Sequence, residues 1–150
     1  MGTDIHVTVQ LETNSGYEDI NLDFYPFDNR NYGVFGFLAD VRNYSHVPPI
    51  SPRRGYPTGY EIRDGDDHYD YHSASWLTVN ELANFNYDTE FEDRRTMKEV
   101  FPGHFNGAWD AGEGNGRITT FRAFLMPSFF DDLEKLIKSG ASRIVFDFDT

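Results

Sequence analysis

Residues 4–12 alternate apolar and polar positions. The apolar set is Ile5, Val7, Val9 and Leu11, and the polar set is Asp4, His6, Thr8 and Gln10. Side chains of a strand point alternately to its two faces, so this pattern predicts a half-buried strand. Residues 17–22 follow a turn signal and are expected to return as a second strand. Residues 143–149 repeat the alternation with Ile144, Phe146 and Phe148, which predicts a strand at the other end of the chain.

Three segments show helix signals. Thr78 and Glu81 are spaced as a capping box, with Leu77 and Leu82 at the staple positions, so a short helix is expected to start near Val79. A longer helix is expected from a cap at Ser128 to Gly140, because its apolar residues recur at helical spacing. Residues 30–44 also have this spacing, although two glycines weaken the prediction.

The remaining segments are less regular. Residues 46–60 hold four prolines and are expected to form a loop, and residues 102–116 hold five glycines and are expected to form another. Residues 92–100 fit a charged helical turn, and residues 117–125 fit a strand. Together the patterns predict an α+β fold in a single domain, residues 1–150. It would have a mostly antiparallel sheet that includes both terminal strands, helices packed on one face, and long loops.

Composition excludes several functions. The formal net charge of −12 and pI near 4.6 disfavour general nucleic-acid binding, which needs lysine and arginine to neutralise phosphates. The chain has no cysteine, which excludes disulfides and thiolate chemistry. It also has no apolar run of membrane-spanning length and no basic-then-apolar N-terminal signal, so we expect a soluble protein with no membrane partner.

The densest chemistry lies in residues 64–82. In an extended segment, Asp66, His68, Asp70 and His72 would share one face and could hold a divalent cation. The other interpretation is a solvated acidic loop over aromatic residues. If a metal is present, the candidate ligands are Asp4, His6, His68, Asp70 and His72, but we expect no metal and no cofactor.

Positive charge gathers in one region of this acidic chain. Residues 29–63 contain five arginines, no lysine and two acids. Arginine suits bidentate recognition of phosphate or carboxylate, so this segment could supply an anion site. Equally, the arginines could neutralise the acidic face that follows them. Arg30 and Arg42, each followed by Asn-Tyr, are expected to mark the two ends of a helix.

Four motifs carry a resemblance. They are Met-Gly-x-Asp-Ile-His at residues 1–6, Arg-Asn-Tyr to Ala-Asp-Val-Arg-Asn at residues 30–43, His-Ser-x-Ser-Trp-Leu-Thr at residues 72–78, and Arg-Ile-Val-Phe-x-Phe-Asp at residues 143–149. With these motifs, which touch about a third of its length, the chain resembles a family of short, mostly uncharacterised bacteriophage proteins. A second histidine often stands in that family where this chain has Ala74, and this departure weakens a metal role for His72. The resemblance implies a viral origin, the host cytoplasm as location and, by analogy, a role against bacterial defence.

Our leading hypothesis is a binding protein that sequesters a small anionic, nucleotide-derived signalling molecule without altering it. Free amides at the start of the Val79 helix and nearby hydroxyls would receive phosphate oxygens, arginines would add charge, and Trp76 would stack on a base. The candidate ligand-binding residues are Arg30, Asn31, Arg42, Asn43, Arg53, Arg54, His72, Ser73, Ser75, Trp76 and Thr78.

Two alternatives stay open. A metal-dependent hydrolase of a nucleotide or phosphoester would use a metal-bound water at the candidate ligands named above. An acidic inhibitor would instead bind a host protein through its negative surface. A homo-oligomer is compatible with each of these, and no catalytic residue is assigned.

Overall fold

The computed structural model describes residues 2–62, 71–102 and 104–150. The chain divides into two compact units. Unit 1 comprises residues 1–30, 52–85 and 127–150, and unit 2 comprises residues 31–51 and 86–126. One domain for the whole chain stays a prediction, because two compact units can belong to a single domain.

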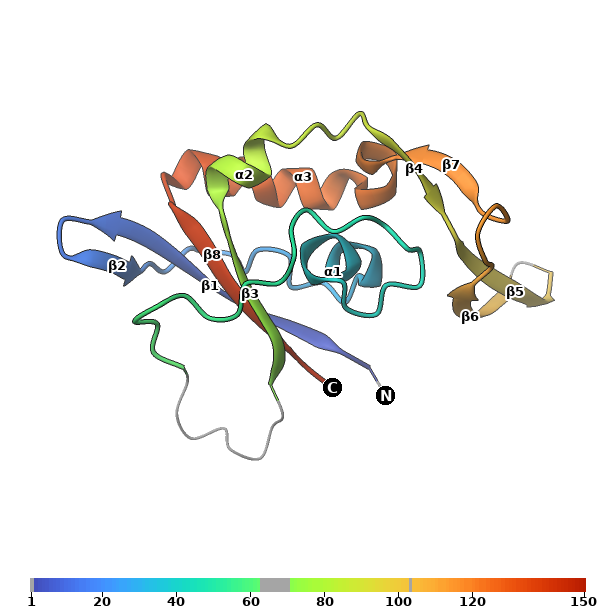
Figure 1. The fold of residues 1–150 in the computed structure, drawn as a ribbon, viewed down its shortest axis with the longest axis horizontal. Helices are drawn as coiled ribbons and strands as arrows, with labels where there is room; N and C mark the ends of the chain where they lie inside the picture. The colour runs from blue at the N-terminus through green and yellow to red at the C-terminus, as the bar shows by residue number, and fades with distance from the viewer. Residues whose placement is uncertain (1, 63–70, 103) are drawn as a thin grey trace. The chain divides into compact units, whose positions relative to one another are not determined.

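Unit 1 is built on a four-stranded antiparallel sheet (Figure 1). Its strands are β1 (Asp4–Thr13), β2 (Gly16–Asp19), β3 (His72–Thr78) and β8 (Arg143–Asp149), in the order β2-β1-β8-β3. Strands β1 and β8 pair from Asp4 opposite Asp149 to Gln10 opposite Arg143. The predicted strands at the two ends of the sequence are therefore confirmed, and they are neighbours in the sheet.

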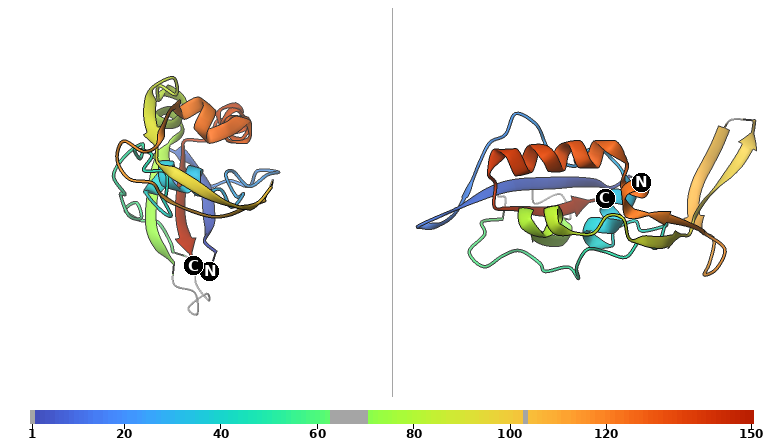
Figure 2. Two further views of the ribbon diagram at one scale, coloured as in Figure 1. Left: turned by 90° about the vertical axis from the view of Figure 1, so that its right-hand side faces the viewer. Right: turned by 90° about the horizontal axis from the view of Figure 1, so that it is seen from above.

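Apolar side chains on one face of this sheet form the core of unit 1. Ile144, Phe146 and Phe148 of β8 are almost completely buried. Helix α2 (Val79–Asn84) and the longer part of α3 (Phe121–Ser139) pack against the sheet (Figure 2). Since strands and helices are mixed and the sheet is antiparallel, the predicted α+β class is confirmed.

The capping box forms as predicted. The Glu81 amide donates to Thr78 Oγ1 at 3.0 Å, and the Thr78 amide donates to Glu81 Oε1 at 3.0 Å. Leu77 and Leu82 on either side are fully buried, as hydrophobic staple residues should be. This local chemistry fixes the start of α2 although the helix is only six residues long.

In its described residues, unit 2 contains a short helix and two antiparallel sheets of two strands each. Helix α1 is Tyr32–Ala39; β4 (Glu90–Asp93) pairs with β7 (Arg117–Thr120), and β5 (Arg95–Phe101) pairs with β6 (His104–Asp110). The first part of α3, up to Met126, also belongs here. The rings of Phe37, Phe91 and Phe121 pack together in its core, with centroid distances of 5.6 and 4.7 Å.

Helix α1 is shorter than the predicted residues 30–44. Asn31 caps it by accepting from the amides of Gly33 and Val34, and Asp40 ends it in the left-handed conformation with φ of 58°. Gly36 allows a close approach that explains a glycine in a helix, because a Cβ there would lie 2.6 Å from Asn43 Oδ1. Asn31 therefore marks one end, whereas Arg42 lies beyond the other end.

Several other boundaries differ from the predictions. Residues 92–100 are mainly strand rather than a helical turn, and β6 lies within the segment 102–116 that was expected to be irregular. The predicted strand 117–125 stops at Thr120, because the Thr120 hydroxyl accepts from the Ala123 amide and caps the start of α3. Met126, with φ of 70°, interrupts α3, and Pro127 begins the second segment one residue before the expected cap at Ser128.

In the described residues, no helix has the length and apolar character needed to cross a membrane.

Candidate functional site

A row of polar side chains crosses the sheet of unit 1. Asp19, Gln10 and Arg143 occupy paired positions on β2, β1 and β8, so their side chains point to the same face. Gln10 Nε2 donates to Asp19 Oδ1 at 2.8 Å, and Arg143 Nε donates to Gln10 Oε1 at 2.7 Å. The amide of Gln10 therefore bridges the arginine and the aspartate and fixes one edge of the guanidinium.

Aromatic rings lie against the same guanidinium. Arg143 Cζ lies 3.4 Å from the centroid of the Tyr17 ring and 5.6 Å from that of the Trp76 ring. Such contacts stabilise a cation through the negative face of the ring. A ring contacts the face of the guanidinium, whereas its N–H groups point outward in the plane. These N–H groups therefore stay available to hydrogen-bond acceptors.

Arg143 is buried without a charged partner in the described structure. Its exposed fraction is 6%, and no described carboxylate lies within ion-pair distance of it. Its η nitrogens donate to no described acceptor, whereas every fully buried described side-chain nitrogen or oxygen atom has a partner. The η nitrogens must therefore be reached by solvent. A buried cation is costly unless it is paired, so this arrangement favours an acceptor that comes from outside the chain.

That solvent reaches Arg143 through a hollow of about 600 Å³. The hairpin of β1 and β2 forms one wall with Gln10, Tyr17 and Asp19, and residues 58–61 form the other. The volume lies within the range of about 300–1,000 Å³ that is typical of small-molecule sites.

The loop that forms the second wall is held over the polar face of the sheet. The Tyr60 hydroxyl donates to Thr8 Oγ1 at 2.9 Å, and the Tyr56 hydroxyl donates to the buried Asp147 at 2.5 Å. The two tyrosine rings stack with an interplanar angle of 6°. The polar face of β1 is therefore covered in part, and Tyr60 is fixed at the hollow.

Among the described residues that line the hollow, acidic side chains outnumber basic ones. They are Glu18, Asp19 and Glu61, together with the guanidinium of Arg143. A polyanion would be repelled by these carboxylates. A ligand with one anionic group, together with hydroxyl or amino groups that donate to carboxylates, would suit the lining.

The arginines predicted for ligand binding mostly have partners within the chain. Arg30 makes a bidentate pair with Asp4 at 2.9 and 2.8 Å, and this hydrogen bonding lowers the pKa of Asp4. Arg53 Nη1 donates to Ser73 Oγ at 2.7 Å. In unit 2, Arg42 Nη1 donates to the Tyr44 hydroxyl at 3.1 Å. These contacts orient the arginines within the fold.

Arg54 is the most strongly engaged of the predicted arginines. It makes a bidentate pair with Glu81 at 2.8 and 2.5 Å, and Nη1 also donates to the Trp76 carbonyl oxygen at 3.1 Å. The hydrogen bonds from Arg54, followed by those from Thr78, lower the pKa of Glu81 to about 2. The guanidinium also lies 4.7 Å from the Trp76 ring centroid, so the ring expected to stack on a base already contacts Arg54 and Arg143.

The candidate residues His72, Ser73, Ser75, Trp76 and Thr78 all lie on strand β3. The Arg54 amide donates to the buried Ser75 hydroxyl at 3.0 Å, and His72 hydrogen-bonds through its two ring nitrogens to Ser73 and Thr150. Two of the amides expected to receive phosphate at the start of α2 have partners within the chain, because the Val79 amide donates to the Ser142 carbonyl and the Glu81 amide donates to Thr78.

The two predicted asparagines also support the backbone. Asn31 caps α1, and Asn43 exchanges hydrogen bonds with the backbone of Val47 at 2.9 and 3.1 Å. Because both belong to unit 2, the structure does not relate them to the arginines and serines of unit 1.

Some of the candidate metal ligands can be placed. His68 and Asp70 lie outside the described residues, as do Arg63, Asp64 and Asp66. His6 Nε2 lies 2.6 Å from Asp149 Oδ2, and Asp4 is paired with Arg30. Within the described ranges, no group of three or more histidine, aspartate or glutamate side chains is placed to hold a metal ion.

The sequence interpretation missed Arg143, Gln10 and Tyr17. A signal was present, because Arg143 stands on the opposite face from Ile144, Phe146 and Phe148 in the last strand. Pairing the two terminal strands in register would have placed Arg143 opposite Gln10. That register depends on long-range contacts, which a local pattern does not determine.

Comparison with protein-family models, with curated proteins and with solved structures finds no match for this chain. The functional argument therefore depends on the geometry of the site.

Proposed function

We propose that the protein binds and sequesters a small nucleotide-derived molecule with a single anionic group in the hollow beside Arg143. The observation that supports this most directly is the buried guanidinium, which contacts two aromatic rings and has η nitrogens without a described acceptor. A phosphate or carboxylate oxygen would complete its hydrogen bonding.

The other groups of a nucleotide match the rest of the lining. Ribose hydroxyls and base amino groups are donors, which the carboxylates of Glu18, Asp19 and Glu61 can accept. The ring of Tyr60 or Tyr17 offers a surface on which a base can stack. The same carboxylates disfavour a second phosphate, so we expect a monophosphate or a cyclic monophosphate rather than a polyphosphate.

The proposed biological role is to withdraw such a molecule from host defence signalling. The resemblance of the four motifs to bacteriophage proteins supports this role, and a binding function without chemical conversion is sufficient for it.

Isothermal titration calorimetry can test the proposal. The ligand panel is adenosine and guanosine monophosphates, their cyclic forms, ADP-ribose, inorganic phosphate and unphosphorylated adenosine. We expect at least one monophosphate to bind more tightly than both inorganic phosphate and adenosine. Arg143→Lys should weaken that binding by about tenfold or more, because a charged bidentate hydrogen bond contributes about 1.5–3 kcal/mol.

A second variant protects the test against misfolding of a chain altered at a buried arginine. Thr58→Trp places a large ring at the exposed wall of the hollow, and Asn80→Trp places the same ring on the exposed surface of α2 as a control. Thr58→Trp should abolish binding, and Asn80→Trp should leave it unchanged. If no panel member binds, or if both tryptophan variants bind as the wild type does, the proposed function is wrong.

A further inference from the structure

A second group of arginines lies in unit 2, where β4 continues into β5. Asp93 on β4 is paired in register with Arg117 on β7, and Arg95 begins β5 two residues later. Asp93 is 2% exposed and accepts from the Arg95 amide at 2.9 Å. The pairing and this short separation place the backbones of two arginines beside one buried carboxylate.

The two guanidinium groups have few partners. Arg95 Nη2 lies 3.8 Å from Asp93 Oδ2, which is too long for a hydrogen bond, and its Cζ lies 5.6 Å from the Phe124 ring centroid. The Arg117 side chain is exposed and makes no hydrogen bond or ion pair with any residue that the structure describes. The group formed by Asp93, Arg95 and Arg117 therefore has a net charge of +1 in a chain of −12.

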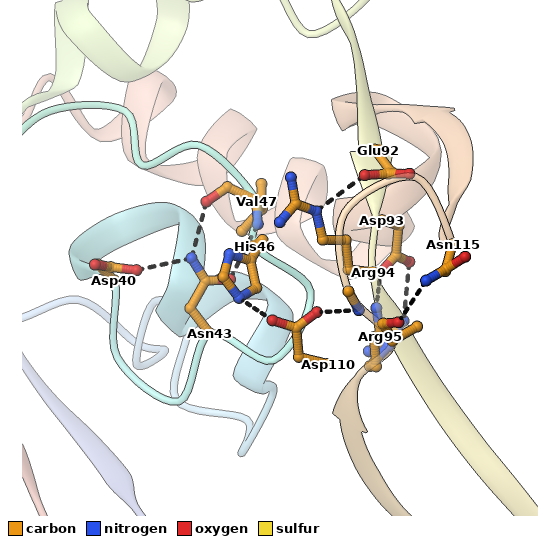
Figure 3. A network of polar contacts seen from close by, with 12 residues as sticks. Asp40, Asn43, His46, Val47, Glu92, Asp93, Arg94, Arg95, Asp110 and Asn115 are labelled. Atoms are coloured by element: carbon orange, nitrogen blue, oxygen red, sulfur yellow. Dashed lines mark hydrogen bonds and ion pairs between the residues drawn. The ribbon is translucent and has the colours of Figure 1, made fainter.

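The neighbouring acids are engaged elsewhere (Figure 3). Glu92 accepts from the Gly114 amide, pairs with Arg94 at 2.9 Å and accepts from the Gly116 amide, and these contacts, the first most strongly, lower its pKa. Asp110 pairs with His46 at 2.5 Å. In the close-up, Arg94 extends to Glu92 while Arg95 lies beside Asp93 and Asn115. Glu92 and Asp110 are therefore paired with residues other than Arg95 and Arg117.

Two adjoining hollows share Asp93, Arg95 and Arg117 as lining residues, with volumes of about 360 and 410 Å³. The larger one is also lined by Phe124 and by two exposed apolar side chains, Ile118 at 65% and Met126 at 56% exposure. The site therefore combines two guanidinium groups with an apolar wall.

We infer that Arg95 and Arg117 form a second binding site, which takes a small organic anion whose carboxylate or phosphate group is carried on an apolar body. The oxyanion would receive N–H donors from both guanidinium groups. Its apolar body would cover Ile118 and Met126, which gains free energy in proportion to the apolar area removed from water. This site lies in unit 2 and does not depend on the function proposed for the hollow beside Arg143.

Calorimetric titration with benzoate, phenyl phosphate and inorganic phosphate tests this inference. We expect benzoate or phenyl phosphate to bind, and the difference between them identifies the oxyanion that the site prefers. Inorganic phosphate should bind at least about tenfold more weakly, because it cannot cover the apolar wall. Equal binding of inorganic phosphate would overturn the assignment of an apolar body.

Matched variants test the residues. Arg117→Gln should weaken binding about tenfold or more, whereas Arg122→Gln, which removes an exposed arginine already paired with Asp88, should not. Ile118→Gln should weaken binding, whereas Ile137→Gln, at a similarly exposed position of α3, should not. Unchanged affinity in Arg117→Gln, or no binding of either organic probe to the wild type, would overturn the inference.

The two sites can be told apart in one experiment. Arg117→Gln should keep the monophosphate binding of the wild type, and Thr58→Trp should keep the binding of benzoate or phenyl phosphate. If each variant instead lost the binding of both kinds of ligand, the second site would not be independent of the first. The inference would then fail.

Discussion

Replacing Glu81 by glutamine separates the charge of this residue from its role at the start of α2. Glutamine can still accept from the Thr78 amide, because the capping box tolerates either residue. It cannot form the bidentate ion pair with Arg54, which in the wild type has distances of 2.8 and 2.5 Å. The helix start should therefore persist while the ion pair is lost.

The expected magnitude follows from the pKa of Glu81. A decrease from 4.5 to about 2 corresponds to about 3.4 kcal/mol at 1.36 kcal/mol per pKa unit. Solvent screening reduces this, because the Glu81 side chain is 35% exposed, so we expect about 1–2 kcal/mol. Since the pKa is lower in the folded chain, this stability is present above pH 4.5 and is lost as the pH falls towards about 2.

Urea denaturation at about pH 7 and about pH 2.5 measures this contribution. Glu81→Gln should be less stable than the wild type at the higher pH, and the difference should shrink at the lower pH. Glu113→Gln is the matched control, because it removes one negative charge from an exposed residue with no described ion pair. If the difference between Glu81→Gln and the wild type were the same at both pH values, the ion pair would not stabilise the fold as argued.

Three further substitutions test the packing and the caps, each by urea denaturation. Leu82→Ala should cost about 2–5 kcal/mol, because Leu82 is fully buried and leaves a cavity; a cost below about 1 kcal/mol would contradict its place in the core. Asn31→Ala should cost about 1 kcal/mol by removing the cap of α1, and Asn31→Asp, which keeps an acceptor, should cost less. Gly116→Ala should cost about 1–3 kcal/mol, because its Cβ would lie 2.3 Å from the Asp93 carbonyl oxygen, and wild-type stability would show that this approach is looser than described.

Local chemistry in the sequence predicts some parts of this fold well. Three signals act within a few residues and therefore predict structure directly from the sequence. They are the capping residues Thr78 and Glu81 at the start of α2, the alternation in β1 and β8, and Gly140 after α3. Gly140 has a φ of 77°, as expected for a residue that ends a helix.

Other parts depend on contacts that the local pattern does not contain. Residues 104–110 include a glycine and have no clear alternation, and they form a strand because β5 pairs with them. His72 to Thr78 likewise form a strand because β8 lies beside them. Tertiary pairing overrides the local tendency in both cases.

The candidate site shows the same division. The sequence interpretation chose arginines of residues 30–54 as candidates, and the structure pairs Arg30 and Arg54 with carboxylates of the same unit. Arg143 was overlooked because its surroundings come from three other strands. Only the sheet order brings Gln10, Tyr17 and Trp76 to it.

The position of β8 has a consequence for how the chain reaches its native state. This strand is the last element in the sequence, yet it lies between β1 and β3, which are not hydrogen-bonded to each other. During synthesis on the ribosome, β1 can pair with β2 early, but more than a hundred later residues must emerge before it can pair with β8. Pairing between strands that are distant in the sequence slows folding. Until β8 is synthesised, the apolar faces of β1 and β3 stay exposed, and these are the surfaces that a chaperone would need to cover.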